Sequence, residues 1–175
     1  KTDVAGVEPY VLLAKISKDD GLTEAENRRQ LLKHLIELRE NDTGNLALGY
    51  FLADQYRKVE NIVEAESLYV QLSKEQPTGN AYRGLCDIYR KTDCWNDLLR
   101  LLGEVAALAG DLDILGNERQ VLAADDRALD SLFREANGTI SEGPLAAGVG
   151  LALGHLALES KRFDEADKYF AIASE

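Results

Sequence analysis

The sequence of 175 residues has little or none of three residue types: it contains no methionine, two cysteines and three prolines. Without a methionine at position 1 there is no initiator residue, so we expect these residues to be a piece of a longer protein. The two cysteines, Cys86 and Cys94, are too few for a disulfide framework, and we expect both to be free thiols. So few prolines leave room for long, uninterrupted helices.

The sequence also lacks the motifs that indicate catalysis, a metal site or a nucleotide site. His34 and His155 lie far apart, and no His-Glu-x-x-His or Cys-x-x-Cys spacing is present. Gly148, Gly150 and Gly154 are spaced in part like a phosphate loop, but no Lys-Ser/Thr follows and no strand precedes them. We interpret these glycines as sites of close helix packing. We therefore expect a chain that is not an enzyme and that has no cofactor and no metal.

Positive charge is scarce, since 20 Lys and Arg residues stand against 31 Asp and Glu residues and the formal net charge is −11. Nucleic acids and anionic membranes are bound by clustered positive charge, so we expect neither as a partner. The acidity is concentrated after residue 100, where 6 basic residues stand against 14 acidic ones. No apolar run is long enough to span a membrane and no signal peptide is visible, and the compartment is unknown.

The spacing of apolar residues predicts helices throughout the chain, and alternating, strand-like runs are nearly absent. Leu31, Leu32, Leu35, Ile36 and Leu38, for example, form a stripe along one side of a helix. Turn residues separate ten expected helices, near residues 8–18, 23–40, 45–58, 61–75, 79–91, 95–108, 112–124, 126–137, 144–160 and 163–174.

Side chains that cap helix starts support these boundaries. Thr23 and Glu26 have the spacing of a capping box, in which each side chain accepts a hydrogen bond from the backbone N–H of the other residue. Asn61 and Glu64 predict a similar cap with an asparagine. The short turns between the helices predict antiparallel helical hairpins.

Three of the hairpins share one pattern of residues. The first has Gly49-x2-Leu52-Ala53-x2-Tyr56, then Ala65-x3-Tyr69, then Pro77. The second, 33 residues later, has Tyr82-x2-Leu85-Cys86-x2-Tyr89, and the last has Gly150-x2-Leu153-Gly154 and then Ala166-x3-Phe170. This pattern resembles the tetratricopeptide repeat, a unit of 34 residues with Trp-x2-Leu-Gly-x2-Tyr, then Ala-x3-Phe, then Pro. The first hairpin departs from it in having Gly49 where the family has tryptophan.

The resemblance implies an all-α fold, an α-α superhelix (solenoid) of about five helix-turn-helix repeats in a single domain, residues 1–175. The units would cover residues 8–40, 45–77, 79–110, 112–138 and 144–175. The first and fourth of these units are degenerate. Small residues such as Ala53, Cys86 and Gly154 would let the two helices of a unit approach closely, and aromatic side chains would fill the space between units.

The resemblance also implies a binding surface, because the first helix of each unit lines the concave face in this family. The free side of those helices would carry Tyr50, Asp54, Arg57, Asn80, Arg83, Asp87 and Arg90. Since arginine binds carboxylates through two parallel hydrogen bonds, an acidic peptide is one candidate ligand. The alternative is that these charges pair within the protein, Asp54 with Arg57 or Arg83 and Asp87 with Arg90. The clamp with which some family members hold chaperone tails is not present.

We therefore expect a protein-protein interaction scaffold that binds a protein or peptide on this concave face. One alternative is a regulatory or sensory domain attached to an enzyme outside these residues. Another is a self-assembling structural solenoid, because the sequence ends at Glu175 without a polar capping helix and the open repeat end would bind another copy.

Overall fold

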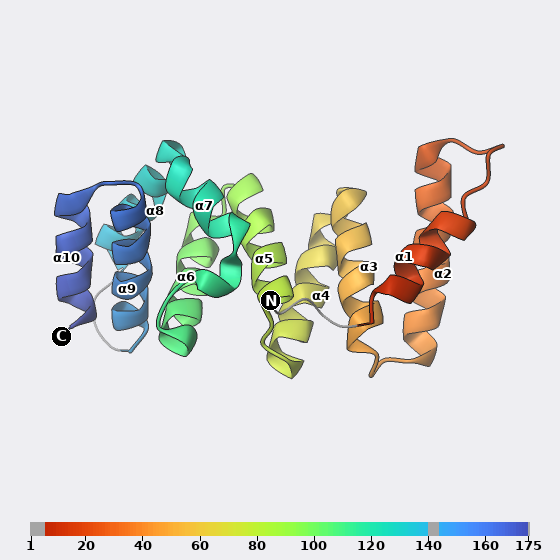
Figure 1. Ribbon diagram of the computed structural model, residues 1–175, viewed down its shortest axis with the longest axis horizontal. Coiled ribbons are helices and arrows are strands. Elements are labelled where there is room, and N and C mark those ends of the chain that lie inside the picture. The colour runs from red at the N-terminus through yellow and green to blue at the C-terminus, as the bar shows by residue number, and fades with distance from the viewer. Residues whose placement is uncertain (1–5, 140–143, 175) are drawn as a thin grey trace. The chain divides into compact units, whose positions relative to one another are not determined.

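The computed structural model describes residues 6–139 and 144–174, and these residues form ten α-helices, one short 3-10 helix and no strand (Figure 1). The fold is all-α, as the sequence predicts. The elements are α1 (Glu8–Ile16), α2 (Glu24–Asn41), α3 (Leu46–Lys58), α4 (Ile62–Glu75), α5 (Gly79–Lys91), α6 (Trp95–Ala109), η1 (Asp113–Leu115), α7 (Asn117–Ala124), α8 (Asp126–Thr139), α9 (Pro144–Glu159) and α10 (Phe163–Ala173). The expected boundaries are confirmed except near η1.

The structure confirms one of the two expected helix caps. The Thr23 hydroxyl accepts a hydrogen bond from the Glu26 N–H at 3.3 Å, and the Glu26 carboxylate accepts one from the Thr23 N–H at 2.8 Å. The cap at Asn61 is wrong, because the Asn61 side chain makes no hydrogen bond to the first turn of α4. The turn is closed instead by backbone, since the Asn61 N–H donates to the Tyr56 carbonyl at 2.9 Å.

That backbone turn occurs in three hairpins of the described chain. In each, the N–H of the residue before the second helix donates to the carbonyl five residues earlier, and the residue just before that donor has a left-handed backbone. The three hydrogen bonds run from Asn61 to Tyr56, Cys94 to Tyr89 and Arg162 to Ala157, at 2.9, 2.9 and 2.8 Å. The left-handed residues are Glu60, Asp93 and Lys161, with φ of 60°, 56° and 63°. The turns join α3 to α4, α5 to α6, and α9 to α10.

The chain divides into two compact units, residues 1–84 and 85–175, with α5 running across the boundary. The core of the first unit is formed by apolar residues of α2 and α3, and α3 also packs against α4. The buried members are Leu31, Leu35, Leu48, Phe51 and Leu52. The short α1 covers this core only partly, with the ring of Tyr10 centred 6.0 Å from that of Phe51.

In the second unit α9 packs closely against both α10 and α6. Glycines permit these approaches. A Cβ at Gly154 would lie 2.6 Å from the Phe170 ring, and one at Gly150 would lie 2.8 Å from the Tyr169 carbonyl oxygen. These contacts confirm the interpretation of the α9 glycines as sites of close helix packing.

The expected helix at 112–124 is broken in two. Residues 113–115 form η1, and α7 begins only at Asn117. Between them Gly116 has φ 54° and ψ −124°, a conformation that side-chain-bearing residues rarely adopt. Within the parts of the chain that the structure describes, no helix is long and apolar enough to cross a membrane.

Candidate functional site

The structure places the predicted site residues of α3 in two different environments. Asp54 accepts a hydrogen bond from Arg57 at 2.9 Å and forms a second ion pair with Lys58 at 2.7 Å. The side chains of Asp54 and Arg57 remain 29% and 31% exposed. The expected pairing of Asp54 with Arg57 is therefore present, and both groups still reach solvent.

Tyr50, by contrast, is buried, with 4% of its surface exposed. Its hydroxyl donates to the Gln76 carbonyl at 3.1 Å and accepts a hydrogen bond from the Thr78 hydroxyl at 2.7 Å. Burial raises the pKa of Tyr50, and nearby Glu75 raises it further, against the lowering effect of the Thr78 hydrogen bond. The ring ties α3 to the turn before α5, so the expectation that it lies on the free side of α3 is wrong.

The other four predicted residues lie along α5 and also pair within that helix. Arg83 donates to the side-chain oxygen of Asn80. Further along, Asp87 is buried and is paired with Arg90 at 3.2 Å and with Lys91 at 2.9 Å. The structure thus brings the predicted residues together as neighbours within single helices, Asp54 with Arg57, Asn80 with Arg83, and Asp87 with Arg90.

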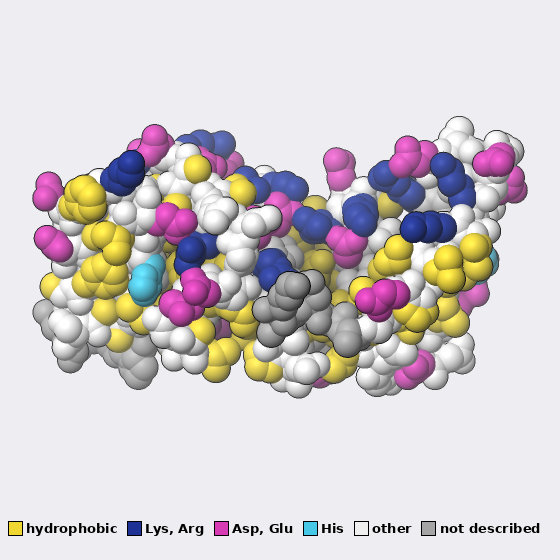
Figure 2. Space-filling view, viewed as in Figure 1, with side chains coloured by type: hydrophobic (Ala, Val, Ile, Leu, Met, Phe, Trp, Pro, Cys, Tyr) yellow, Lys and Arg dark blue, Asp and Glu magenta, His cyan; other side chains and the backbone are white. Residues whose placement is uncertain are grey.

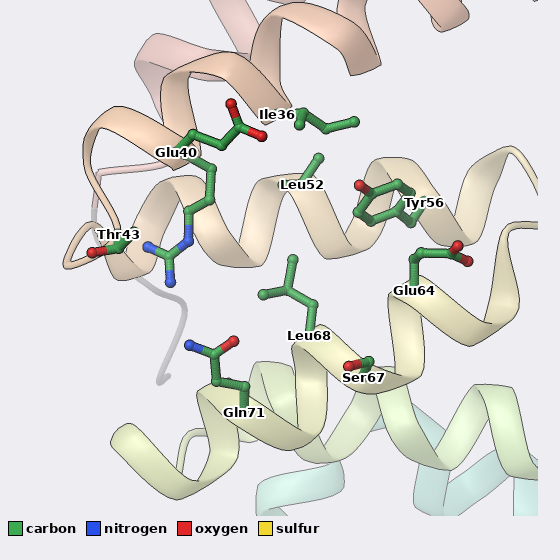
Figure 3. Close-up of a pocket in the computed structure, with 10 residues that line it drawn as sticks. Ile36, Glu40, Thr43, Leu52, Tyr56, Glu64, Ser67, Leu68 and Gln71 are labelled. Carbon is green, nitrogen blue, oxygen red and sulfur yellow. The ribbon is translucent and has the colours of Figure 1, made fainter.

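A cleft of about 360 Å³ in the first unit was not foreseen from the sequence. It is lined by side chains of α2, α3 and α4 and by Thr43 of the α2–α3 turn (Figure 3). Its apolar lining residues are Ile36, Leu52 and Leu68, one from each of the three helices. Its polar lining residues are Arg39, Glu40, Thr43, Tyr56, Glu64, Ser67 and Gln71.

Arg39 is the most unusual of these lining residues, because only 9% of its surface is exposed. Its Nη1 donates to the carbonyls of Asn45 at 2.8 Å and of Asp42 at 3.4 Å, which holds the α2–α3 turn. The guanidinium carbon lies 3.4 Å from where a Cβ of Gly49 would be. Arg39 and Leu72 therefore occupy the space left open by the glycine that stands in the tryptophan position.

Two acidic side chains line the same cleft. In Figure 3, Glu40 lies at the upper left on α2 and Glu64 at the right on α4. Burial raises the pKa of the Tyr56 hydroxyl, and the negative charge of Glu64 raises it further. Arg39 is the only cation among the lining residues that the structure describes.

A periodicity argument would have found Arg39. It follows Leu31 and Leu35 at intervals of four residues, so it continues the buried stripe of α2. Leu38, which we expected in that stripe, is 42% exposed. The sequence signal that we did not use was a charged residue, Arg39, at a position where the spacing predicts burial.

The remaining reactive groups of the described residues lie apart from one another. Among the described residues no three His, Cys, Asp or Glu side chains are grouped so that they could hold a metal ion. Both cysteines are free, and burial raises the pKa of the Cys86 thiol far above its ordinary value. His155 packs at right angles to the Phe170 ring, with ring centres 5.5 Å apart.

Comparison of the chain with models of known protein families gives no match, and comparison with curated protein sequences gives none either.

Proposed function

We propose that this protein is a protein-interaction module built from tetratricopeptide-like helical hairpins. The observation that carries the proposal is the recurrence of one turn geometry at residues 61, 94 and 162. These positions are 33 and 68 residues apart, which is one and two repeats of about 34 residues. Recurrence of local geometry at the period of the sequence pattern is the expected mark of stacked repeats.

Packing in the pattern positions supports the same proposal. The small residues Ala53, Ala65 and Ala166 are buried, with at most 3% of their surface exposed. A Cβ at Gly154 would meet the Phe170 ring of the same hairpin. A small residue therefore faces an aromatic ring there, as the sequence pattern of the family leads one to expect.

The proposed binding groups are Arg57, Arg83 and Arg90 on the first helices of the hairpins. Each of them donates to a side chain three residues away in the same helix. The pair of Arg57 with the part-exposed Asp54 is of a kind that contributes only about 0–1 kcal/mol to stability, so a peptide carboxylate can replace that contact at little cost. An acidic peptide is accordingly the ligand class that we propose.

The test uses an array of synthetic peptides rich in Asp and Glu, with charge-reversed Lys and Arg versions on the same array. We expect acidic peptides to bind, and Arg83→Glu and Arg90→Glu to weaken binding about tenfold or more by replacing attraction with repulsion. Arg100→Glu is the matched control, because Arg100 is a 59% exposed arginine of α6, outside the proposed face. Binding that survives both face variants, or that Arg100→Glu reduces equally, contradicts the proposal.

A second copy of the chain is the alternative partner. Figure 2 shows hydrophobic side chains gathered over α9 and α10. On these two helices Leu158 and Phe163 are 50% and 60% exposed. Exposed apolar patches often mark interaction sites. Sedimentation of the wild type and of Phe163→Glu tests this alternative: self-association that the substitution abolishes supports it, and a wild type that stays monomeric at high concentration rules it out.

A further inference from the structure

We propose that the cleft between α2, α3 and α4 is a ligand site for a small organic monocarboxylate, whose carboxylate pairs with the buried guanidinium of Arg39. The proposal rests on the cleft of the first unit alone and is independent of the peptide-binding function proposed above.

The first argument is the state of Arg39. It is nine-tenths buried, yet it forms no ion pair within the part of the chain that the structure describes. Its one bonded nitrogen, Nη1, donates to two backbone carbonyls. Nε and Nη2 make no hydrogen bond within the described chain, and neither is a fully buried atom, so both are open to solvent or to a ligand. A buried charge is normally paired, because removing it from water is costly without a counter-ion. A carboxylate in the cleft would supply that counter-ion and accept the remaining N–H groups.

The second argument is the shape and the apolar lining of the cleft. Its volume of about 360 Å³ lies near the lower end of the range for small-molecule sites, roughly 300–1,000 Å³. Leu52 is buried, while Ile36 and Leu68 are half-buried, so the cleft offers aliphatic surface to a ligand. Figure 3 shows the Leu68 side chain directed from α4 toward α3. A short aliphatic tail next to the carboxylate fits this lining.

The third argument is that the charges lining the cleft favour an anion with a single negative charge. Glu40 and Glu64 line the cleft together with the single cation Arg39. A ligand with one negative charge meets the guanidinium, whereas a second negative charge would approach one of these carboxylates. Repulsion between like charges therefore disfavours dicarboxylates and phosphate. The proposed ligand class is a monocarboxylate with an aliphatic tail.

The alternative is that Arg39 only holds the α2–α3 turn through its Nη1 hydrogen bonds. Ligand binding separates the two roles. We suggest titrating the 175-residue chain with hexanoate, hexanamide, adipate and phosphate, followed by backbone amide NMR shifts. The proposal expects saturable 1:1 binding of hexanoate, with shifts concentrated at α2, α3 and α4. It expects hexanamide to bind about tenfold more weakly, because the charge-assisted hydrogen bonds are lost, and adipate and phosphate to bind more weakly than hexanoate.

Substitutions complete the test. Arg39→Gln should abolish hexanoate binding, and a cooperative thermal transition would show that the variant is folded. Glu64→Gln alters an exposed side chain of α4, so it should fold normally while strengthening adipate binding several-fold more than hexanoate binding. Equal binding of hexanoate and hexanamide overturns the proposal. No saturable hexanoate binding in the wild type, or no change in adipate binding when Glu40→Gln and Glu64→Gln are combined, would overturn it as well.

Discussion

The backbone of Gly148 in α9 lies directly against the backbone carbonyl of Gly103 in α6, so close that a Cβ on Gly148 would overlap the carbonyl oxygen. The next side chain along α6 that such a Cβ would meet is Ala107, at 3.1 Å. This crossing of two glycines explains why α9 packs against α6 although α7 and α8 separate them in the sequence.

The crossing predicts the effect of adding one methyl group. Gly148→Ala should lower the free energy of unfolding by about 1–3 kcal/mol, because backbone atoms cannot move aside as a side chain can. Gly138→Ala is the matched control, since Gly138 lies in α8 and a Cβ there meets nothing within 4 Å. That control should stabilise by about 0.5–1 kcal/mol through helix propensity. Urea denaturation measures both, and a loss of stability no larger at Gly148 than at Gly138 would contradict the crossing.

The shared hairpin turn predicts a stabilising substitution. Glu60 has φ 60°, and a left-handed backbone costs a residue other than glycine about 1–2 kcal/mol. Glu60→Gly removes this cost and should therefore raise the free energy of unfolding by about 1 kcal/mol. The gain is smaller than the full cost of the left-handed backbone because glycine has more conformational freedom in the unfolded chain. Lys74→Gly, inside the last turn of α4, should do the opposite and cost about 0.5–1 kcal/mol. If thermal melting shows that both variants are less stable than the wild type, Glu60 does not have a left-handed backbone.

Tyr169 predicts a loss of stability in alkali. Its ring is 1% exposed, its hydroxyl donates to the Phe133 carbonyl at 3.3 Å, and burial, with a smaller effect of Glu165, raises its pKa to about 12. The unfolded tyrosine titrates near pH 10, so between pH 10 and 12 the unfolded state loses a proton that the folded state keeps. The free energy of unfolding should therefore fall between pH 10 and 12. Below pH 10 the Tyr169 hydroxyl should cause no change in it.

Comparison with Tyr169→Phe isolates this effect from other groups that titrate in alkali. The variant should lose about 1 kcal/mol at pH 8, because the hydrogen bond to the Phe133 carbonyl is removed. Its melting temperature should then decline less steeply than that of the wild type between pH 10 and 12. If the melting temperatures of the wild type and of Tyr169→Phe declined equally between pH 10 and 12, the Tyr169 hydroxyl would ionise as easily in the folded protein as in the unfolded one.

Local features of the fold were predictable because they depend on residues close in sequence. The capping box at Thr23 and Glu26 follows from side-chain chemistry over one helical turn. The glycines of α9 were correctly expected to be packing sites: Gly150 and Gly154, four residues apart, face α10, whereas Gly148 faces α6. Asn61 shows the limit of such reasoning, since the Tyr56 carbonyl already closes the turn by backbone and the side-chain cap is not formed.

The candidate sites were less predictable, because burial depends on which helices meet. Tyr50 lies on a helix face that the repeat phase leaves free, yet hydrogen bonds to Gln76 and Thr78 bury it against the turn before α5. The spacing of Arg39 from Leu31 and Leu35 predicts that it is buried, whereas its charge predicts that it is exposed. Its guanidinium lies in the space left beside Gly49.

The sequence by itself determined the all-α class and the helix boundaries outside residues 112–124, because apolar spacing and turn residues act over a few residues. The tertiary structure decided that α9 meets α6, that Arg39 is buried and that a cleft opens between α2, α3 and α4. These features depend on the fit of side chains between helices, where one glycine or one arginine changes how closely two backbones approach.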